Sequence, residues 1–454
     1  MSLAATRRPR RGGRPPRSTA EIVRALVSPR TGIVAALRPL PRRGAESGLW
    51  RMTASTPDYG RLPGLSSVST PGGTGFDREG AALPAVFEAV ERYCGAFVDP
   101  AREVFRAAGG DDRFLCGDAL PLYSARQHAA PGFPFRPLDA AAEVHWTPAR
   151  ALAGGAERWV PSLTVHVPYQ PRPGEALHTL STSTGMACGA TPAAAALSGL
   201  LEVAERDAFM IMWLNRLSMP RLRVDPASRL GRELGALRAT MGPHELHFVD
   251  LTGDIDIPVV LCLLERPLGG GAGPAVTVGA SANPCAEVAA RKAAFEALGQ
   301  YLRLVEIHAA GAPAFCPAAD FGNVDSFELH NLVYTDPGAA AALRFITASP
   351  IERALPAAPT RAARDPAAAL ADCVARFRAR GLDPLCVDLT TRDVRELGLA
   401  ALKIIVPGAV AMAGHHRYPL LGTPRLYRIA CELGHRARPA THDDLNLDWP
   451  HPFA

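Results

Sequence analysis

The chain has 454 residues, of which 48% are apolar, 20% charged and only 6% aromatic. This composition excludes disordered, collagen-like and disulfide-dense proteins, and the length is sufficient for a large core. The formal net charge is +5, but residues 1–43 hold eleven arginines and a single acid, Glu21, so the rest of the chain carries −5.

Lysine and cysteine usage excludes particular sites. Only two of the 49 basic residues are lysines, Lys292 and Lys403, and neither follows a glycine. A P-loop requires Gly-Lys-Ser/Thr, so a nucleotide must be bound in another way. The nine cysteines are scattered and form no CxxC pair. This argues against a zinc ribbon and favours a reduced, cytoplasmic setting. No run of 18 apolar residues occurs, so we expect no membrane span.

Residues 1–20 form an arginine- and proline-rich head, which we expect to be a disordered tail. Such a head can bind nucleic acid or an acidic peptide. A solvated tail is the simpler interpretation, and we expect no nucleic-acid partner. No long linker interrupts residues 21–454, so we expect one domain there.

Three later segments are predicted to be helices because apolar residues recur at i, i+3, i+4 and i+7. They cover residues 83–97, 197–208 and 288–302. Apolar runs typical of strands lie at 159–167, 245–249, 258–265, 275–279, 385–388 and 403–406, and loops are expected at 60–75, 129–137, 167–175 and 266–274. Without a regular βαβ repeat, this order predicts an α+β or mixed α/β fold, with helices layered on antiparallel or mixed sheets.

The pattern Glu-x-x-Glu-Arg occurs once in each of the first two predicted helices, as Glu88, Glu91 and Arg92 and as Glu202, Glu205 and Arg206. In each helix the three charges lie on one side, away from the apolar stripe. Two carboxylates one turn apart repel each other unless a cation joins them, and carboxylates combined with phosphates suit Mg²⁺. The alternative is a pair of surface helices with weak Glu–Arg ion pairs.

The surroundings of this pattern resemble the YcaO family. A run of small residues, STSTGMACG, occupies 181–189, and GLLEVAERDA follows at 199–208. The third helix carries GQYLRL at 299–304. Residues 28–33 are similar to the opening of such domains and residues 416–427 to a stretch near their end. The resemblance covers about residues 21–454 and implies a YcaO-type fold with an ATP site that has no P-loop.

By matching position, the resemblance implies ATP and Mg²⁺ as cofactors. The metal would be held by Glu88, Glu91, Glu202 and Glu205, and the nucleotide site would also include Arg206, Lys292, Glu296 and Gln300. Lys292 stands where the family usually has arginine, and the family's glutamine often lies one residue earlier, at Gly299 here.

Three positions depart from the family pattern. Thr74 replaces the lysine of a usual Gly-Lys-Gly, Pro84 stands where a serine is expected, and Thr184 replaces a common asparagine. A proline suits the start of a helix, so we predict that the first helix begins near Pro84. These changes put the affinity for nucleotide in question, although all four glutamates are present.

The chain ends in Pro450-His-Pro452-Phe-Ala454. This is similar to the Pro-x-Pro-x-Pro end of azoline-forming members, with Ala454 in place of the last proline. The resemblance implies that this end lies in the active site, that the Ala454 carboxylate acts as or positions the general base, and that Pro450 and Pro452 belong to the catalytic end. A frayed tail is the alternative.

The implied reaction is ATP- and Mg²⁺-dependent cyclodehydration of Cys, Ser or Thr in a ribosomal precursor peptide, through phosphorylation of the backbone amide oxygen. The products would be thiazolines or oxazolines. Two alternatives stay open, a thioamide-forming enzyme and a weakly catalytic scaffold that binds a peptide or partner. The Pro-His-Pro end argues against the first, and Thr74 and Pro84 favour the second.

The resemblance also implies partner proteins. We find no added leader-binding domain before the resemblance begins, so we expect an E1-like (ThiF-like) protein that brings the precursor peptide. We further expect a dehydrogenase in the same complex and a homodimer. The sequence has no GxSxG or HExxH motif, and His415-His416 is interpreted as a structural pair.

Overall fold

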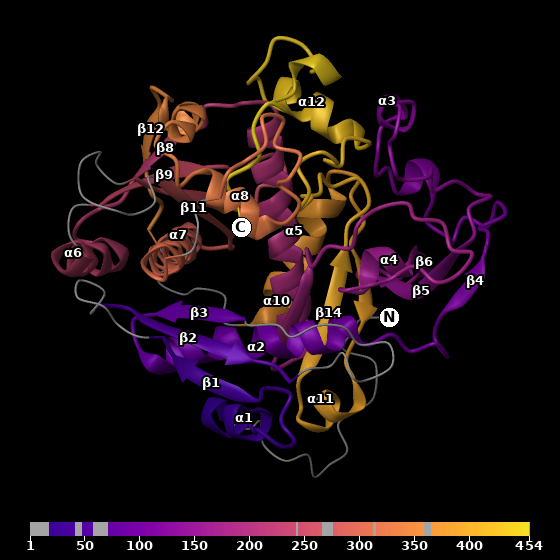
Figure 1. Cartoon of the computed structure of the whole chain (residues 1–454), viewed down its shortest axis with the longest axis horizontal. Helices are drawn as coiled ribbons and strands as arrows, with labels where there is room; N and C mark the ends of the chain where they lie inside the picture. Colours follow the sequence, from indigo (N-terminus) through magenta and orange to yellow (C-terminus); the bar gives the residue numbers. More distant parts are fainter. Residues whose placement is uncertain are drawn as a thin grey trace.

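The computed structural model describes residues 18–40, 48–57, 71–241, 244–265, 276–311, 315–357 and 365–453. These residues form three β-sheets that are covered and separated by helices (Figure 1). Within the described residues, the only parallel strand pair joins β8 and β12, and the remaining strand pairs are antiparallel. The predicted α+β class, with helices layered on antiparallel or mixed sheets, is therefore confirmed.

A three-stranded sheet lies next to α1 (Thr19–Leu26) and α2 (Arg78–Ala96), and its strands are β1 (Ala36–Pro39), β2 (Trp50–Ser55) and β3 (Gly72–Gly75). Ser18 caps α1, because its hydroxyl accepts from the N–H of Glu21 and its own N–H donates to the Glu21 carboxylate. This capping box fixes the helix start. The expected tail boundary after residue 20 therefore falls inside a helix, and residues 1–17 lie outside the described chain.

A five-stranded sheet has the order β11 (Val276–Ala282), β10 (Val259–Glu265), β9 (Glu245–Asp250), β8 (Arg221–Arg223) and β12 (Glu352–Ala354). Strand β10 is continuously apolar because helices cover both of its faces. Val260, Cys262 and Leu264 pack in one cluster with α7 (Ala286–Ala309). Val259, Leu261 and Leu263 pack in another with α5 (Pro192–Leu214).

A six-stranded sheet has the order β4 (Val104–Arg106), β5 (Val144–Ala151), β13 (Leu385–Asp388), β14 (Ala400–Ile405) and β7 (Met186–Gly189), with β6 (Glu157–Pro161) also paired to β5. Helix α5 packs against β14 and β7 of this sheet and against β10 and β11 of the five-stranded sheet. It is therefore the central helix that joins the two larger sheets (Figure 1).

The other helices are shorter or peripheral. They are α3 (Ala125–His128), α4 (Ser162–Val165), α6 (Arg229–Met241), α8 (Phe327–Val333), α9 (Arg344–Thr347), α10 (Pro366–Arg378), α11 (Arg392–Glu396) and α12 (Pro424–Glu432), with 3₁₀ turns at Gly117–Ala119, Ala339–Leu343 and His442–Asp444. Within the described ranges, no helix combines the length and the apolar character that crossing a membrane requires.

The three predicted helices are confirmed as α2, α5 and α7, each longer than expected. Three local predictions are wrong in whole or in part. The run 159–167 is a strand only to Pro161, where α4 begins and the Thr164 hydroxyl donates to the Pro161 carbonyl. Pro84 does not start α2, because Asp77 caps that helix by accepting from the N–H of Gly80 at 2.7 Å. The expected loop 60–75 contains β3 in its last four residues, and residues 58–70 and 266–275 lie outside the described chain.

Candidate nucleotide site

The charged faces of α2, α5 and α7 meet at a cavity of about 1000 Å³. Six of the predicted residues line it together with Arg92, and these six are Glu88, Glu91, Glu202, Arg206, Glu296 and Gln300. Glu205 does not line the cavity, but its carboxylate lies 3.9 Å from the Arg206 guanidinium. The three helices that the sequence singled out therefore bring their charges to one place.

Glycines in the small-residue run explain how α5 reaches this position. A Cβ on Gly199 of α5 would lie 2.5 Å from the Gly185 carbonyl oxygen, so only glycine permits this approach. Gly185 has a φ of +83°, and its N–H donates to Glu202 Oε2 at 2.9 Å. The run at 181–189 is therefore the surface on which α5 packs, and it fixes the direction of the Glu202 side chain.

Two arginines compensate part of the negative charge. Arg92 lies 3.2 Å from Glu88 and 3.7 Å from Glu91. Arg206 lies 3.3 Å from Glu202 and 3.9 Å from Glu205. Each arginine thus serves the two glutamates of its own helix, as the repeated sequence pattern indicates.

Burial makes it unfavourable for three of the carboxylates to be ionised, so their pKa values are raised. It raises the pKa of Glu91 well above the usual 4.5, and the like charges of Glu202 and Glu88 add to the shift. Burial and the charge of Glu296 raise the pKa of Glu205 in the same way. Burial also raises the pKa of Glu296 to about 7, although its Oε2 accepts from the N–H of Ala280. An added cation would relieve this excess negative charge.

The donor set fits Mg²⁺ that arrives with a nucleotide. Among the described residues, no three His, Cys, Asp or Glu side chains already converge as a metal site. Mg²⁺ commonly takes only one or two protein carboxylates and completes its shell with phosphate oxygens and water. Carboxylates spread along the wall of a large cavity suit that mode of binding. Glu88, Glu91 and Glu202, which line the cavity, would supply them together with Glu205, which lies beside Arg206.

Two cations at this site were not predicted. Arg51 of β2 lines the cavity and pairs with Glu306 at 2.6 Å. Its buried Nη1 has no hydrogen-bond partner within the described chain, and such a nitrogen fits a phosphate oxygen. Lys403 of β14 is 2% exposed and donates to the Thr182 carbonyl at 2.5 Å, and burial lowers its pKa to about 7. Glu202 and Glu91 oppose that shift, so Lys403 lies within their field.

The remaining predicted residues differ in their positions. Gln300 lines the cavity, and its Oε1 accepts from Asn331 at 3.4 Å. Lys292 is exposed and does not line the cavity, although its charge acts on Glu205. A Cβ on Gly299 would lie 2.8 Å from Thr74 Oγ1. Two departures from the family pattern therefore contact each other, because Thr74 occupies the space that a side chain at 299 would need.

The end of the chain is packed into the protein, against the alternative of a frayed tail. Residues 450–453 are all buried. Tyr334 donates its hydroxyl proton to the Pro450 carbonyl at 2.5 Å, and the His330 ring nitrogen bonds the carbonyl of the next residue at 3.0 Å. The Arg206 guanidinium lies 4.8 Å from the centre of the Phe453 ring. The described chain thus ends beside the glutamate cluster, and Ala454 lies outside the described residues.

Comparison with known proteins gives a family. Residues 72–410 match the family model described as YcaO cyclodehydratase, ATP- and Mg²⁺-binding. An uncharacterized protein of Methanothermobacter thermautotrophicus is 31% identical over 201 residues, which are 44% of this chain and 49% of that protein. The match thus spans about half the length of that relative.

Solved structures show the same fold. A heterocyclase in complex with substrate and cofactor has a TM-score of 0.75 at 24% identity, over 96% of this chain and 57% of that one. The YcaO protein of Methanopyrus kandleri, bound with AMPPCP and Mg²⁺, has a TM-score of 0.59 at 16% identity, over 88% and 91%. The E. coli microcin synthetase McbBCD complex with pro-MccB17 bound has a TM-score of 0.57 at 12% identity, over 84% and 90%.

Proposed function

The chain belongs to the YcaO family of ATP- and Mg²⁺-binding proteins, and we propose that it is a cyclodehydratase that forms thiazoline or oxazoline rings in a ribosomal precursor peptide. The observation that carries this proposal is the cavity at which glutamates from α2, α5 and α7 meet. Burial raises the pKa of Glu91 and of Glu296 at this cavity, so their ionised forms would be stabilised by an added cation. The nearby chain end adds a second catalytic element.

In the proposed reaction, a Cys, Ser or Thr side chain of the peptide loses its proton and adds to the preceding amide carbonyl. ATP supplies the phosphoryl group that turns the former carbonyl oxygen into a leaving group. Loss of phosphate and of the amide proton leaves the C=N bond of the ring, so each ring costs the peptide one water. The protein needs no nucleophile of its own for this sequence.

The residues of the chain hold the reactants and move protons. The four helix glutamates would bind Mg²⁺, which neutralises charge on the phosphates. Arg206 and Arg51 would contact phosphate oxygens, and Glu296 and Gln300 would complete the lining of the nucleotide site. Lys292 would act on that site from outside the lining, through its charge. The Ala454 carboxylate would accept or direct the proton of the attacking group. Pro450 and Pro452 would hold that end in place, as the buried bonds of residues 450–453 support.

The proposed partners follow from the same family. The McbBCD complex and the substrate-bound heterocyclase support a peptide substrate and partner chains. We propose an E1-like protein that presents the precursor peptide, a dehydrogenase that oxidises the rings, a homodimeric enzyme and a cytoplasmic setting.

Reconstitution with the precursor peptide and the E1-like partner tests the activity by mass spectrometry. We expect the loss of one water per ring, with one phosphate released for each. Replacement of oxygen by sulfur, with sulfide present, would instead indicate the thioamide alternative. Peptide binding without any change in mass would support the scaffold alternative and contradict the proposal.

Removal of Phe453 and Ala454 tests the role of the chain end. We expect the truncated protein to form rings at least about a hundredfold more slowly, as for loss of a general base. Because Phe453 packs against Arg206, a weaker affinity for nucleotide is expected as well, so turnover is compared at saturating nucleotide. Unchanged turnover would remove the chain end from the mechanism.

A further inference from the structure

A second cavity, of about 500 Å³, lies at the C-terminal end of α2. Tyr93 of this helix and Phe97, which caps its C-terminal end, line the second cavity, whereas Glu88 and Glu91 of the same helix line the nucleotide cavity. No role in the proposed reaction uses this second cavity, which we call the sheet-gap cavity.

A break in the six-stranded sheet creates this space. On one side of β5, β6 pairs along residues 146–150, while on the other side β4 pairs with 144–146 and β13 with 150–151. Residues 147–149 therefore face no described strand on that second side. The N–H of Leu152 donates to the Pro384 carbonyl, next to β13. Because backbone N–H and C=O groups alternate between the two sides of a strand, those of the even-numbered residues of β5 point toward β13. Pro148 has no backbone N–H to donate on that side, so the hydrogen bonding between β5 and β13 stops before this residue.

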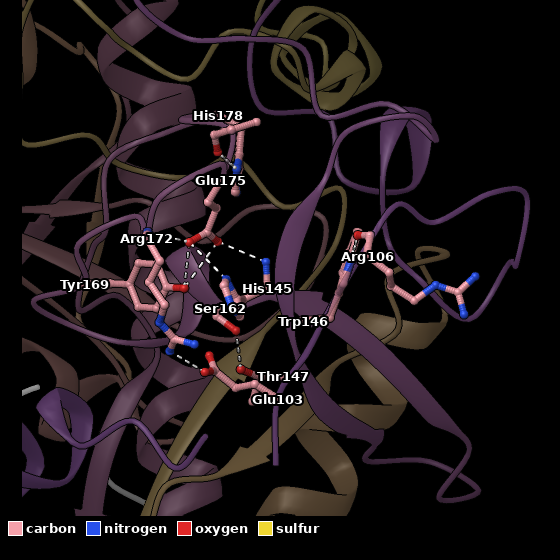
Figure 2. A network of polar contacts seen from close by, with 11 residues as sticks. Glu103, Arg106, His145, Trp146, Thr147, Ser162, Tyr169, Arg172, Glu175 and His178 are labelled. Carbon is pink, nitrogen blue, oxygen red and sulfur yellow. Dashed lines mark hydrogen bonds and ion pairs between the residues drawn. The ribbon is translucent and has the colours of Figure 1, made fainter. Parts of the chain in front are cut away.

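A buried carboxylate oxygen lies at this gap. Glu103 lines the cavity, and its side chain is 3% exposed. Its Oε2 accepts from the Arg172 guanidinium, but its buried Oε1 has no hydrogen-bond partner among the described residues. Figure 2 shows the carboxylate between that guanidinium and the hydroxyls of Thr147 and Ser162, which bond each other at 2.8 Å. A buried acceptor of this kind requires a donor.

The neighbouring loop holds Glu103 in this position. Arg172 is fixed through its own N–H, which donates to Glu175 at 3.0 Å. The same carboxylate accepts from the Tyr169 hydroxyl at 3.0 Å and from the N–H of His145 at 3.0 Å (Figure 2). Because this network is closed around Glu175, the free Glu103 oxygen is left for a ligand rather than for the loop.

The lining of the cavity favours a planar cation. It contains five acids and two arginines, which are Asp99, Glu103, Asp388, Asp393, Glu396, Arg102 and Arg392. Arg102 already donates to the Asp388 carbonyl at 2.8 Å, so this strand edge accepts a guanidinium. Phe97, 44% exposed, provides an aromatic face on which a guanidinium can stack.

We propose that the sheet-gap cavity binds the guanidinium of an arginine side chain presented by a peptide, with Glu103 Oε1 as its acceptor and Phe97 as its stacking surface. This binding goes beyond the proposed reaction and does not depend on it. A charge-assisted hydrogen bond from the guanidinium to Oε1 would complete the hydrogen bonds of Glu103 and exclude water from the gap.

Calorimetric titration of the full chain with N-acetyl-arginine methylamide tests the proposal, with the citrulline analogue as the uncharged control. We expect the arginine probe to bind at least about tenfold more tightly than the citrulline probe. Glu103→Gln should weaken the binding of the arginine probe by about tenfold or more, whereas Glu157→Gln, at the exposed first residue of β6, should not.

Phe97→Ala provides a second variant that does not disturb the Arg172 pair. We expect about two- to fivefold weaker binding, with no change for Phe105→Ala, which is 45% exposed on β4 and outside the cavity lining. Absence of binding by both the wild-type chain and the chain that lacks residues 2–17 would overturn the proposal. Binding by Glu103→Gln and by Phe97→Ala that equals binding by the wild type would show that the gap holds only water and would overturn it as well.

The arginine can come from the chain's own head or from another molecule, and removal of residues 2–17, which contain six arginines, distinguishes the two. Tighter probe binding by the truncated chain assigns the ligand to the head, and equal binding assigns it to a separate peptide. Both results support the site. None of these titrations requires ATP or ring formation. Absence of arginine binding would therefore not contradict the proposed reaction, and absence of ring formation would not contradict the arginine site.

Discussion

Helix α5 carries two groups of buried charges in adjacent positions, and they differ in how their charge is balanced. Asp207 is 1% exposed, and both of its oxygens accept from Arg425, which also donates to Asp254 at 2.8 Å. Burial opposes ionisation of Asp254, yet the hydrogen bonds and charge of Arg425 lower its pKa. Two residues earlier on the helix, burial instead raises the pKa of Glu205, and it also raises that of Glu91, which α2 brings to the same cluster.

This difference separates a structural group from a functional one. The Asp207–Arg425–Asp254 group is complete within the protein, since its acids and its base satisfy each other. The glutamate cluster is incomplete, because Arg92 and Arg206 do not balance the buried carboxylates. Removing a member of the first group should therefore affect stability, and removing a member of the second should affect ligand binding.

The largest expected effect is that of Glu202→Ala on turnover. Glu202 is only part-buried and lies on the cavity wall, so its loss should leave the unfolding temperature nearly unchanged. Ring formation should fall by about two to three orders of magnitude, since charge stabilisation at the phosphates is lost. Glu432→Ala, at an exposed residue of α12, is the matched control. A Glu202→Ala enzyme with wild-type turnover would contradict the assignment.

Arg425→Met should reveal the opposite behaviour. It leaves Asp207 and Asp254 buried without their partner, so we expect the free energy of unfolding to fall by about 3–5 kcal/mol. Urea denaturation measures this loss, and Arg428→Met on the exposed face of the same helix provides the control. A loss under about 1 kcal/mol would show that the group is not a structural anchor.

The pH dependence of stability sharpens the comparison. Glu91, Glu205 and Glu296 bind protons more tightly in the folded chain than in the unfolded chain, because their folded pKa values are raised. Their contribution to stability should therefore fall as pH rises from the usual 4.5 through about 7, the folded pKa of Glu296. The lowered pKa of Asp254 acts in the reverse sense, since its contribution is lost only as pH falls into the acid range.

Mg²⁺ with a nucleotide analogue should remove the destabilisation that the glutamates cause. We expect the ligand to raise the melting temperature more at about pH 8 than at about pH 5.5, as measured by differential scanning fluorimetry. Glu91→Gln should reduce the difference between the two pH values. An equal stabilisation at both would contradict the raised pKa values.

The sequence predicted the fold class and the glutamates because both depend on local periodicity. The spacing of Glu88 and Glu91 defines a helix face, and its repetition at Glu202 and Glu205 marks a shared site. Lys403 and Arg425 were not identified, because their contacts depend on long-range pairing. Lys403 reaches the cluster through the pairing of β14 with β7, and only its interruption of the apolar run 399–414 could have drawn attention to it.

The start of α2 was also predicted wrongly from local sequence rules. A proline is favoured in the first turn of a helix, and this rule placed the start near Pro84. Asp77 caps the helix earlier, so Pro84 lies in its interior and on the cavity wall. The hydrogen bond from the Gly80 N–H to Asp77 decides between these two possible helix starts, and the apolar periodicity of the sequence does not show which residue makes such a bond.

The smallest expected effect belongs to the arginine-rich head. Removal of residues 2–17 should leave ring formation within about twofold of the full chain, because the glutamate cluster lies on helices that begin after residue 77. Steady-state kinetics with and without added nucleic acid check this. Loss of activity in the truncated enzyme would mean that the head takes part in catalysis.

Calorimetric titration with AMPPCP tests the central claim, that glutamates from three helices form a metal–nucleotide site. We predict that the wild-type chain binds one AMPPCP in the presence of Mg²⁺ and that EDTA abolishes binding. Glu91→Gln and Glu202→Gln should each weaken binding at least about tenfold, while Glu432→Gln should bind as the wild type does. Equal affinity in all four proteins, or binding that is independent of Mg²⁺, would contradict the claim.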